Sequence, residues 1–151
     1  MLLKTLVFFL FLLLPSFVHA LSGRVVHVAD GDTITILTGS KKPVKVRLYG
    51  IDCPEKKQAY GQAARKFTAA LVAGKDVYVE EMGQDRYGRT VGIVGKLNES
   101  LLEAGLAWVY PQFCKASFCK KWKAIETDAK KTRRGLWADS NPVAPWIWRR
   151  K

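Results

Sequence analysis

Histidine and cysteine are scarce in this sequence, and their scarcity excludes several kinds of active site. The chain has 2 His and 3 Cys. His19 falls in an apolar N-terminal segment, and His27 falls in an alternating, strand-like pattern. Mechanisms that need paired or clustered His residues are therefore excluded. Any catalysis must depend on carboxylates, Arg, Tyr or a metal ion.

Acidic residues are also few compared with basic ones. The chain has 13 Asp and Glu against 25 Lys and Arg, which gives a net charge of +12 at pH 7. Such an excess favours a polyanionic partner, with nucleic acid first and an anionic membrane or cell-wall polymer second. Charge alone leaves open a basic protein without such a partner.

A long apolar run is missing as well. The longest one, Leu6–Leu14, is shorter than the about 20 residues that span a bilayer. Lys4 precedes it and the compact residues Val18–Ala20 follow, which favours a secretory signal peptide at residues 1–20, cleaved after Ala20, over a membrane anchor. Cleavage would leave residues 21–151 as one exported domain, periplasmic or extracellular and without stable membrane insertion.

The three cysteines are Cys53, Cys114 and Cys119. Three pairings are formally possible, and disulfides persist in exported proteins. Cys114 and Cys119 are close in sequence, so we predict that they form the disulfide and that Cys53 is free. A zinc site of His27 with the thiols is a poor rival.

Two hydrophobic periods alternate along the chain. Short β-branched runs separated by Gly, Asp and Pro turns predict strands, at Val25–Val28, Ile34–Ile36, Val44–Leu48, Lys75–Glu81 and Val91–Val94. Helical spacing predicts three helices, at Gln58–Val72, at Asn98–Ala104 and at Lys120–Arg134. The first helix should bury Ala63, Ala64, Phe67, Ala70 and Leu71, and Asn98 should be the N-cap of the second.

Five strands with a helix after the third, and more helix at the end, predict an α+β fold. The expected form is a five-stranded OB-fold β-barrel with about three helices. The pattern alone also allows an α+β sandwich.

Two aspartates follow neighbouring predicted strands. Asp32 ends the Asp30-Gly31-Asp32 turn, and Asp52 lies beyond the third strand. Carboxylates from separate strands can converge on one hard cation such as Ca²⁺ or Mg²⁺. The alternative for Asp30–Asp32 is a simple hairpin turn.

Other side chains match what phosphodiester hydrolysis needs. Glu55 could take a proton from an attacking water, although it could also be a carboxylate at a helix N-terminus. Arg47 and Arg89 could bind phosphate oxygens, or they could be surface ion-pair residues. Tyr87 could donate to a phosphate or simply belong to a turn.

Three blocks together resemble the signature blocks of the staphylococcal nuclease-like (thermonuclease) family. They are Asp30–Thr33, Arg47–Glu55 and Asp85–Arg89, and the segment Asn98–Gly105 resembles the helix that follows them. The similarity extends over about residues 23 to 138.

The resemblance implies an OB-fold enzyme that cleaves DNA and RNA with Ca²⁺ and leaves 3′-phosphate ends. It places Asp32 and Asp52 on calcium carboxylates and Cys53 on a ligand that acts through its backbone carbonyl. The implied general base is Glu55. Arg47 and Arg89 are implied to bind phosphate, and Arg86 keeps the positive charge of the usual Lys. Tyr87 is implied to hydrogen-bond a phosphate, and Tyr110 to stack on a base.

The sequence also departs from the family pattern. Position 53 is often Thr, and the segment between Glu55 and Tyr60 is shorter than the founding member's loop. The expected substrate is single-stranded or frayed DNA or RNA, bound without sequence preference by a monomer. Trp146 and Trp148, beside Arg149 and Arg150, could stack on bases, although packing of the tail on the barrel is the preferred interpretation.

Two rival functions remain at this stage. One is a related barrel that has lost catalysis and only binds nucleic acid. The other is a cationic protein that acts on membranes or cell wall. Both lack a reason to keep Asp32, Arg47, Asp52, Glu55 and Arg89 together.

Overall fold

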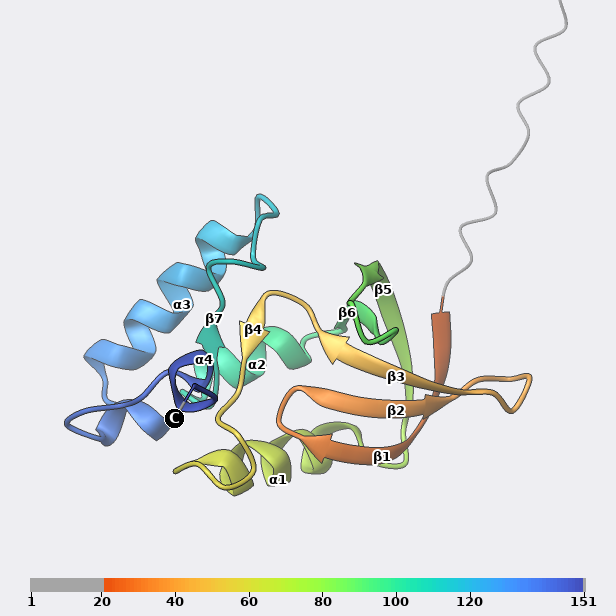
Figure 1. The fold of residues 1–151 in the computed structure, drawn as a ribbon, viewed down its shortest axis with the longest axis horizontal. Helices are drawn as coiled ribbons and strands as arrows, with labels where there is room; N and C mark the ends of the chain where they lie inside the picture. The colour runs from red at the N-terminus through yellow and green to blue at the C-terminus, as the bar shows by residue number, and fades with distance from the viewer. Residues whose placement is uncertain (1–20, 151) are drawn as a thin grey trace, which may run out of the picture.

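The structure, a computed structural model, describes residues 21–150 (Figure 1). The predicted signal peptide, residues 1–20, lies outside the described residues. No helix within residues 21–150 has the length and apolar character needed to cross a membrane.

Five strands close into a barrel in the order β1-β2-β3-β6-β5. All neighbouring pairs are antiparallel except β3 and β6, which run parallel. The strands are β1 Leu21–Asp30, β2 Thr33–Leu37, β3 Pro43–Leu48, β5 Asp76–Gln84 and β6 Thr90–Val94. The OB-type barrel is thus confirmed, and the sandwich alternative is wrong.

The barrel closes because alternate strand residues fill its interior. β-Branched and Leu side chains point inward and are almost fully buried, namely Val25, Val28, Ile34, Ile36, Val46, Leu48, Val79 and Val94. The alternation in the sequence therefore predicted where the strands lie. It did not predict their full lengths, because these depend on hydrogen bonds to neighbouring strands.

Two short strands were not predicted. β4 (Ile51–Asp52) and β7 (Trp108–Val109) pair antiparallel outside the barrel. Each has two residues, too few to give a period. Their pairing is important for the site because it fixes Asp52 opposite Trp108.

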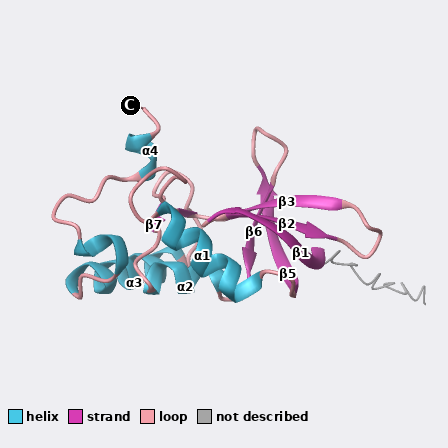
Figure 2. Ribbon diagram, turned by 90° about the horizontal axis from the view of Figure 1, so that it is seen from below, coloured by secondary structure: helices cyan, strands magenta, loops and turns pink. Residues whose placement is uncertain are grey.

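The helices lie on one side of the barrel (Figure 2). They are α1 Gly61–Val72, α2 Leu97–Glu103, α3 Cys119–Lys131, a 3₁₀ turn η1 Gly135–Ala138 and the short α4 Pro145–Trp148. The three predicted helices are present with shifted ends. η1 and α4 are short and were not predicted.

Two details of the predicted helices are wrong. The buried face of α1 is Gly61, Ala64, Thr68 and Val72, whereas Ala63, Ala70 and Leu71 are exposed. Thr68 is buried because its hydroxyl donates to the carbonyl of Gly31 at 2.6 Å, a contact that an apolar pattern cannot predict.

Asn98 is not an N-cap but lies inside α2, whose N-cap is Lys96. Its amide is fully buried: Nδ2 donates to the carbonyl of Tyr49 at 3.0 Å, and Oδ1 accepts from the Val94 amide at 3.2 Å. Asn98 therefore links α2 to the segment that leads into β4.

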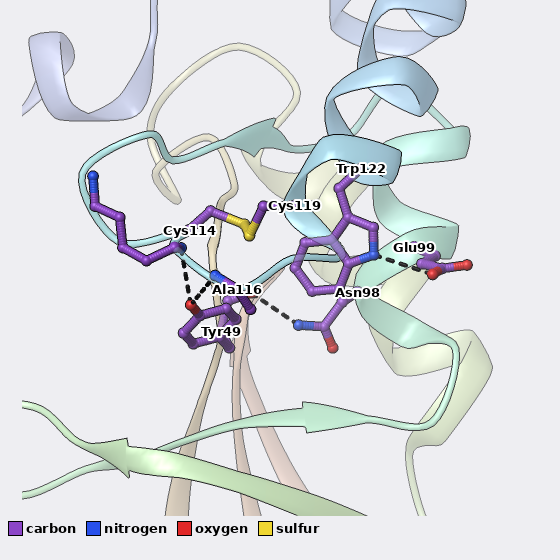
Figure 3. The surroundings of a disulfide bond; sticks show 8 residues. Tyr49, Asn98, Glu99, Cys114, Ala116, Cys119 and Trp122 are labelled. Atoms are coloured by element: carbon purple, nitrogen blue, oxygen red, sulfur yellow. Dashed lines mark hydrogen bonds between the residues drawn. A yellow bond between two sulfur atoms is a disulfide. The ribbon is translucent and has the colours of Figure 1, made fainter.

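The predicted disulfide between Cys114 and Cys119 is present (Figure 3), and Cys53 is free. It closes the loop between β7 and α3. The Tyr49 hydroxyl accepts from the amides of Lys115 and Ala116 at 3.0 and 3.2 Å. A side chain at Gly50 (φ +68°) would meet the Sγ of Cys114 at 2.7 Å, so the disulfide packs directly on the turn before β4.

Candidate active site

The two predicted metal carboxylates lie together at one end of the barrel. Asp32 is in the turn between β1 and β2, and Asp52 ends β4; both are almost fully buried. The carbonyl of Asp32 accepts from the Leu48 amide at 2.9 Å, and its Oδ2 accepts from the Cys53 amide at 2.6 Å. The turn interpretation of Asp30–Asp32 is also correct, because Oδ1 of Asp30 accepts from the Asp32 amide at 3.1 Å.

Arg47 joins the two carboxylates. From β3, its Nη2 lies 3.2 Å from Oδ2 of Asp32 and 2.9 Å from Oδ1 of Asp52. Its Nη1 donates to the carbonyls of Leu48 and Ile51, both at 2.8 Å. Burial would lower the pKa of Arg47, but the charges of Asp32 and Asp52 outweigh burial and raise it. The guanidinium is thus held rigidly in its charged form.

The Cys53 side chain lies in the apolar core beside Gly31 and Ala64. A side chain at Gly31 would meet the Cys53 Sγ at 2.8 Å and the Cβ of Ala64 at 2.7 Å. Burial raises the pKa of the thiol well above its ordinary value. The thiol therefore stays neutral, and only the backbone of Cys53 could contribute a ligand.

Three carboxylates, those of Asp30, Asp32 and Asp52, lie close together at this end of the barrel. Burial raises the pKa of Asp30 to about 7, and the charge of Asp32 adds to the rise. Burial also raises the pKa of Asp52, against the hydrogen bond from Arg149 that lowers it. Carboxylates crowded in this way favour a hard cation with oxygen ligands. Within residues 21–150, no three His, Cys, Asp or Glu side chains form a metal cage.

Glu55 lies on the loop after β4 and contacts an arginine from the end of the chain. Oε1 of Glu55 accepts from Nη1 of Arg149 at 2.6 Å. Arg149 also holds Asp52, with Nη2 2.8 Å from Oδ2 and Nη1 3.3 Å from Oδ1. Glu55 precedes α1 by six positions, so its interpretation as a helix N-terminal carboxylate is wrong.

Arg89 lies on the loop between β5 and β6, just before β6. Val91, two residues further, is the register partner of Arg47, which places Arg89 beside the strand that carries Arg47. Its Nε donates to Oδ2 of Asp85 at 2.6 Å. Burial of Asp85 is outweighed by the hydrogen bonds from Arg89, which lower the pKa of Asp85. The structure thus brings Arg89 to the same sheet region without a contact to Asp32 or Asp52 among the described residues.

The same loop presents the predicted phosphate-binding pair to solvent. Tyr87 is 68% exposed. Nη2 of Arg86 donates to its hydroxyl at 2.6 Å, and the guanidinium of Arg86 lies 4.8 Å from the ring centre. These side chains are free to meet a ligand that reaches the loop.

Tyr110, the predicted base-stacking residue, already has an aromatic neighbour on its face. The ring of Trp146, from α4, stacks on it with centroids 4.9 Å apart and planes at 6°. The ring centroids of Trp108 and Trp146 lie 5.7 Å apart, with the ring planes at 77°. The tail therefore packs on β7 and the segment that follows it. The prediction that Trp146 packs the tail against the domain is correct, but the surface that it covers is this segment and not the barrel.

Comparison with known proteins identifies the family. The profile of the staphylococcal nuclease homologue family matches residues 45–139. The chain belongs to this family. The matched range includes Arg47, Asp52, Glu55 and Arg89, while Asp32 lies before it.

Several named proteins are similar to this nuclease over most of its length. It is 42% identical to an uncharacterized endonuclease of Escherichia coli O157:H7, over 91% of this chain and 90% of that protein. A micrococcal nuclease of Shigella flexneri is 38% identical over 85% of this chain and 80% of its own. A staphylococcal-like nuclease of Arabidopsis thaliana is 43% identical over 72% of this chain but 34% of its own length. The predicted enzyme class, a nuclease, is confirmed.

Sequence analysis of this nuclease missed two polar residues of the site. One is Arg149, which the sequence shows only as a basic neighbour of Trp148 with no role of its own. The other is Gln58, whose Oε1 accepts from the Glu55 amide at 3.0 Å and whose Nε2 donates to the Val143 carbonyl at 2.6 Å. Neither belongs to a motif. Gln58 lies on the same loop as Glu55, whereas Arg149 reaches the site because the tail folds back over this loop.

Proposed function

We propose that this nuclease is exported, requires Ca²⁺, and hydrolyses the phosphodiester bonds of DNA and RNA with little sequence preference, leaving 3′-phosphate ends. The observation that carries the proposal is the contact of Arg47 with both Asp32 and Asp52, together with the link from Asp52 to Glu55 through Arg149. This arrangement supports the proposed roles of two cation ligands, a phosphate-binding group and a base that act together.

Asp32, Asp52 and the backbone carbonyl of Cys53 are the proposed ligands of the cation. These are hard oxygen donors, which suit Ca²⁺ or Mg²⁺ and not zinc. The preference for Ca²⁺ rests on the family. Bound there, the cation would neutralise the developing charge of the phosphoryl group.

Glu55 is the proposed general base, which takes a proton from the attacking water. General bases of this kind typically contribute about 10² to 10⁴ in rate. Arg47 and Arg89 would hold the phosphoryl oxygens through planar, permanently charged donors. Arg89 would have to exchange its contact with Asp85 for a substrate oxygen, which requires a small rearrangement of the loop between β5 and β6.

Arg86, Tyr87 and Tyr110 are the proposed substrate-binding residues. The exposed pair Arg86 and Tyr87 could meet a backbone phosphate, and Tyr110 could stack on a base with the ring face that Trp146 does not cover. Contacts of these kinds hold single-stranded or frayed nucleic acid without reading its sequence.

The apolar N-terminal run and the disulfide between Cys114 and Cys119 support export, because structural disulfides persist outside the reducing cytosol. We propose residues 21–151 as the mature, monomeric domain.

A digestion controlled by chelator tests the proposal. Residues 21–151 should degrade single-stranded DNA and RNA with Ca²⁺, and end-group analysis should find 3′-phosphates. Activity that survives the chelator would contradict the metal requirement. The variants Glu55→Ser and Arg89→Gly should each be slower by orders of magnitude with folding retained, and normal cleavage by both would contradict the assigned roles.

A further inference from the structure

Arg149 comes from the C-terminal end of the chain and contacts two carboxylates of the site. It lies 97 positions from Asp52 and 94 from Glu55 in sequence, yet contacts both carboxylates. Within residues 21–150, it is the sole polar partner of the Glu55 side chain. A carboxylate on a loop, 38% exposed, would otherwise be free to rotate about its side-chain bonds.

The tail that carries Arg149 is firmly seated. Ala144 is 4% exposed, and Pro145 begins α4 in a buried position. Trp146 stacks on Tyr110, and Gln58 holds Val143 while also holding the amide of Glu55. The Glu55 loop and the tail are therefore joined at the backbone through Gln58 and at the side chains through Arg149.

The contacts with Arg149 leave one acceptor position of the Asp52 carboxylate without a hydrogen bond. A carboxylate offers about four acceptor positions. The Asp52 carboxylate uses three of them, for Nη2 of Arg47 and both Nη atoms of Arg149. The fourth position accepts no hydrogen bond from residues 21–150, and it could bind a metal ion while Arg149 stays in place.

We propose that Arg149 is a positioning residue of this nuclease, which holds the Glu55 carboxylate at a fixed place beside Asp52 so that it can accept a proton from water. The proposal deepens the proposed function and rests on it. Arg149 acts through Glu55, because its guanidinium group bridges Glu55, the proposed base, and Asp52, a proposed cation ligand. The C-terminal tail is thereby part of the active site and not an appendage.

The chain offers a matched control for its test. Arg150 follows Arg149 and is exposed, and the structure gives its side chain no hydrogen bond or ion pair within residues 21–150. Arg150→Gln removes the same charge one position further on. It should leave kcat, KM and stability unchanged.

Steady-state cleavage of a short single-stranded DNA with Ca²⁺ is the main measurement. Arg149→Gln should lower kcat by about a hundredfold, since misplacement of a reacting group by about 1 Å costs that much. KM should stay within about threefold, because the substrate contacts remain. Arg149→Lys keeps the positive charge but lacks the two parallel donors of the guanidinium. Its kcat should therefore lie between that of Arg149→Gln and that of the parent protein.

A double-mutant cycle separates positioning from a general structural role. In a Glu55→Gln background, Arg149→Gln should have no further effect on kcat, because the group that it positions is already gone. Calcium affinity of Arg149→Gln, measured by calorimetry without substrate, should stay within about threefold of the parent value. Both measurements remain informative if the variant is less stable.

Several results would overturn the proposal. They are a kcat for Arg149→Gln equal to that of Arg150→Gln, additive effects in the double mutant, or a gain in activity or calcium affinity in Arg149→Gln. A gain would mean that the tail blocks the site. An inactive parent protein would instead contradict the proposed function itself, so the two failures are distinguishable.

Discussion

The indole of Trp146 stacks face to face on the ring of Tyr110, with centroids 4.9 Å apart. This contact fixes α4 against the segment that follows β7, and through β7 it adjoins Asp52. The stack is thus the main apolar anchor of the segment that delivers Arg149.

Removal of this anchor should weaken the fold by a modest amount. Trp146→Ala loses the stack on Tyr110 and the edge contact with Trp108, so we expect a loss of about 2 kcal/mol in the free energy of unfolding. Urea unfolding measures it. Trp148→Ala is the control, because Trp148 is 38% exposed, and it should lose clearly less. Equal losses in the two variants would contradict the anchoring role.

Arg47→Gln should destabilise the protein, and Ca²⁺ should partly reverse the loss. Without Arg47, Asp32 and Asp52 are two buried carboxylates without their shared counter-charge, which costs about 3 kcal/mol. A cation bound between them would supply the missing positive charge. Thermal unfolding with and without Ca²⁺ checks this. The increase in Tm with Ca²⁺ should be larger in Arg47→Gln than in the parent; a smaller increase would argue against a cation at these carboxylates.

Opening the disulfide should lower stability without loss of the barrel. The disulfide joins two cysteines only 5 positions apart in sequence. For a loop of this length, the loss of chain entropy in the unfolded state contributes about 2 kcal/mol to the free energy of unfolding. The paired variant Cys114→Ser with Cys119→Ser should lose that amount in urea unfolding. Circular dichroism should remain that of the parent. Cys53→Ser is not a suitable control, because Cys53 lies in the core.

Glu99 should make stability depend on pH in the acid range. Hydrogen bonds from Lys121 and then from Nε1 of Trp122 lower the pKa of Glu99 below its ordinary value of 4.5. The folded state binds a proton less readily than the unfolded state here, so the contribution is full above pH 4.5 and is lost as the pH falls through the lower, folded-state pKa. The Lys121 side chain is 65% exposed and that of Glu99 is 29% exposed, which limits the effect to about 1 kcal/mol or less.

The comparison of Glu99→Gln with the parent tests this sign. The parent should be the more stable at pH 7, and the difference in unfolding free energy should shrink toward pH 3. A difference that is constant with pH would mean that the carboxylate charge contributes nothing.

The sequence predicted the barrel well because its strands carry their own signal. Alternation at Ile34 and Ile36, or at Val44 and Val46, follows from one face being buried, which is a local property. The site carboxylates were found because Asp32 and Asp52 follow predicted strands, and ends of neighbouring strands meet. Family blocks added Glu55 and Arg89.

The parts that sequence reasoning missed depend on contacts between distant segments. β4 and β7 are too short to show a period, and Asn98 follows the pattern of a cap although it links α2 to Tyr49. Arg149 had no motif, and its role follows only from where α4 rests. Local patterns cannot encode such contacts, because each depends on the fold being complete.

Because the Cys53 thiol is buried, its chemical reactivity reports on opening of the structure around it. The thiol is 3% exposed and lies against Gly31 and Ala64, directly beneath the turn that carries Asp32. A thiol reagent can reach it only when this end of the barrel separates from α1. The rate at which Cys53 reacts is therefore a measure of how often α1 separates, in the folded state, from the turn that carries Asp32.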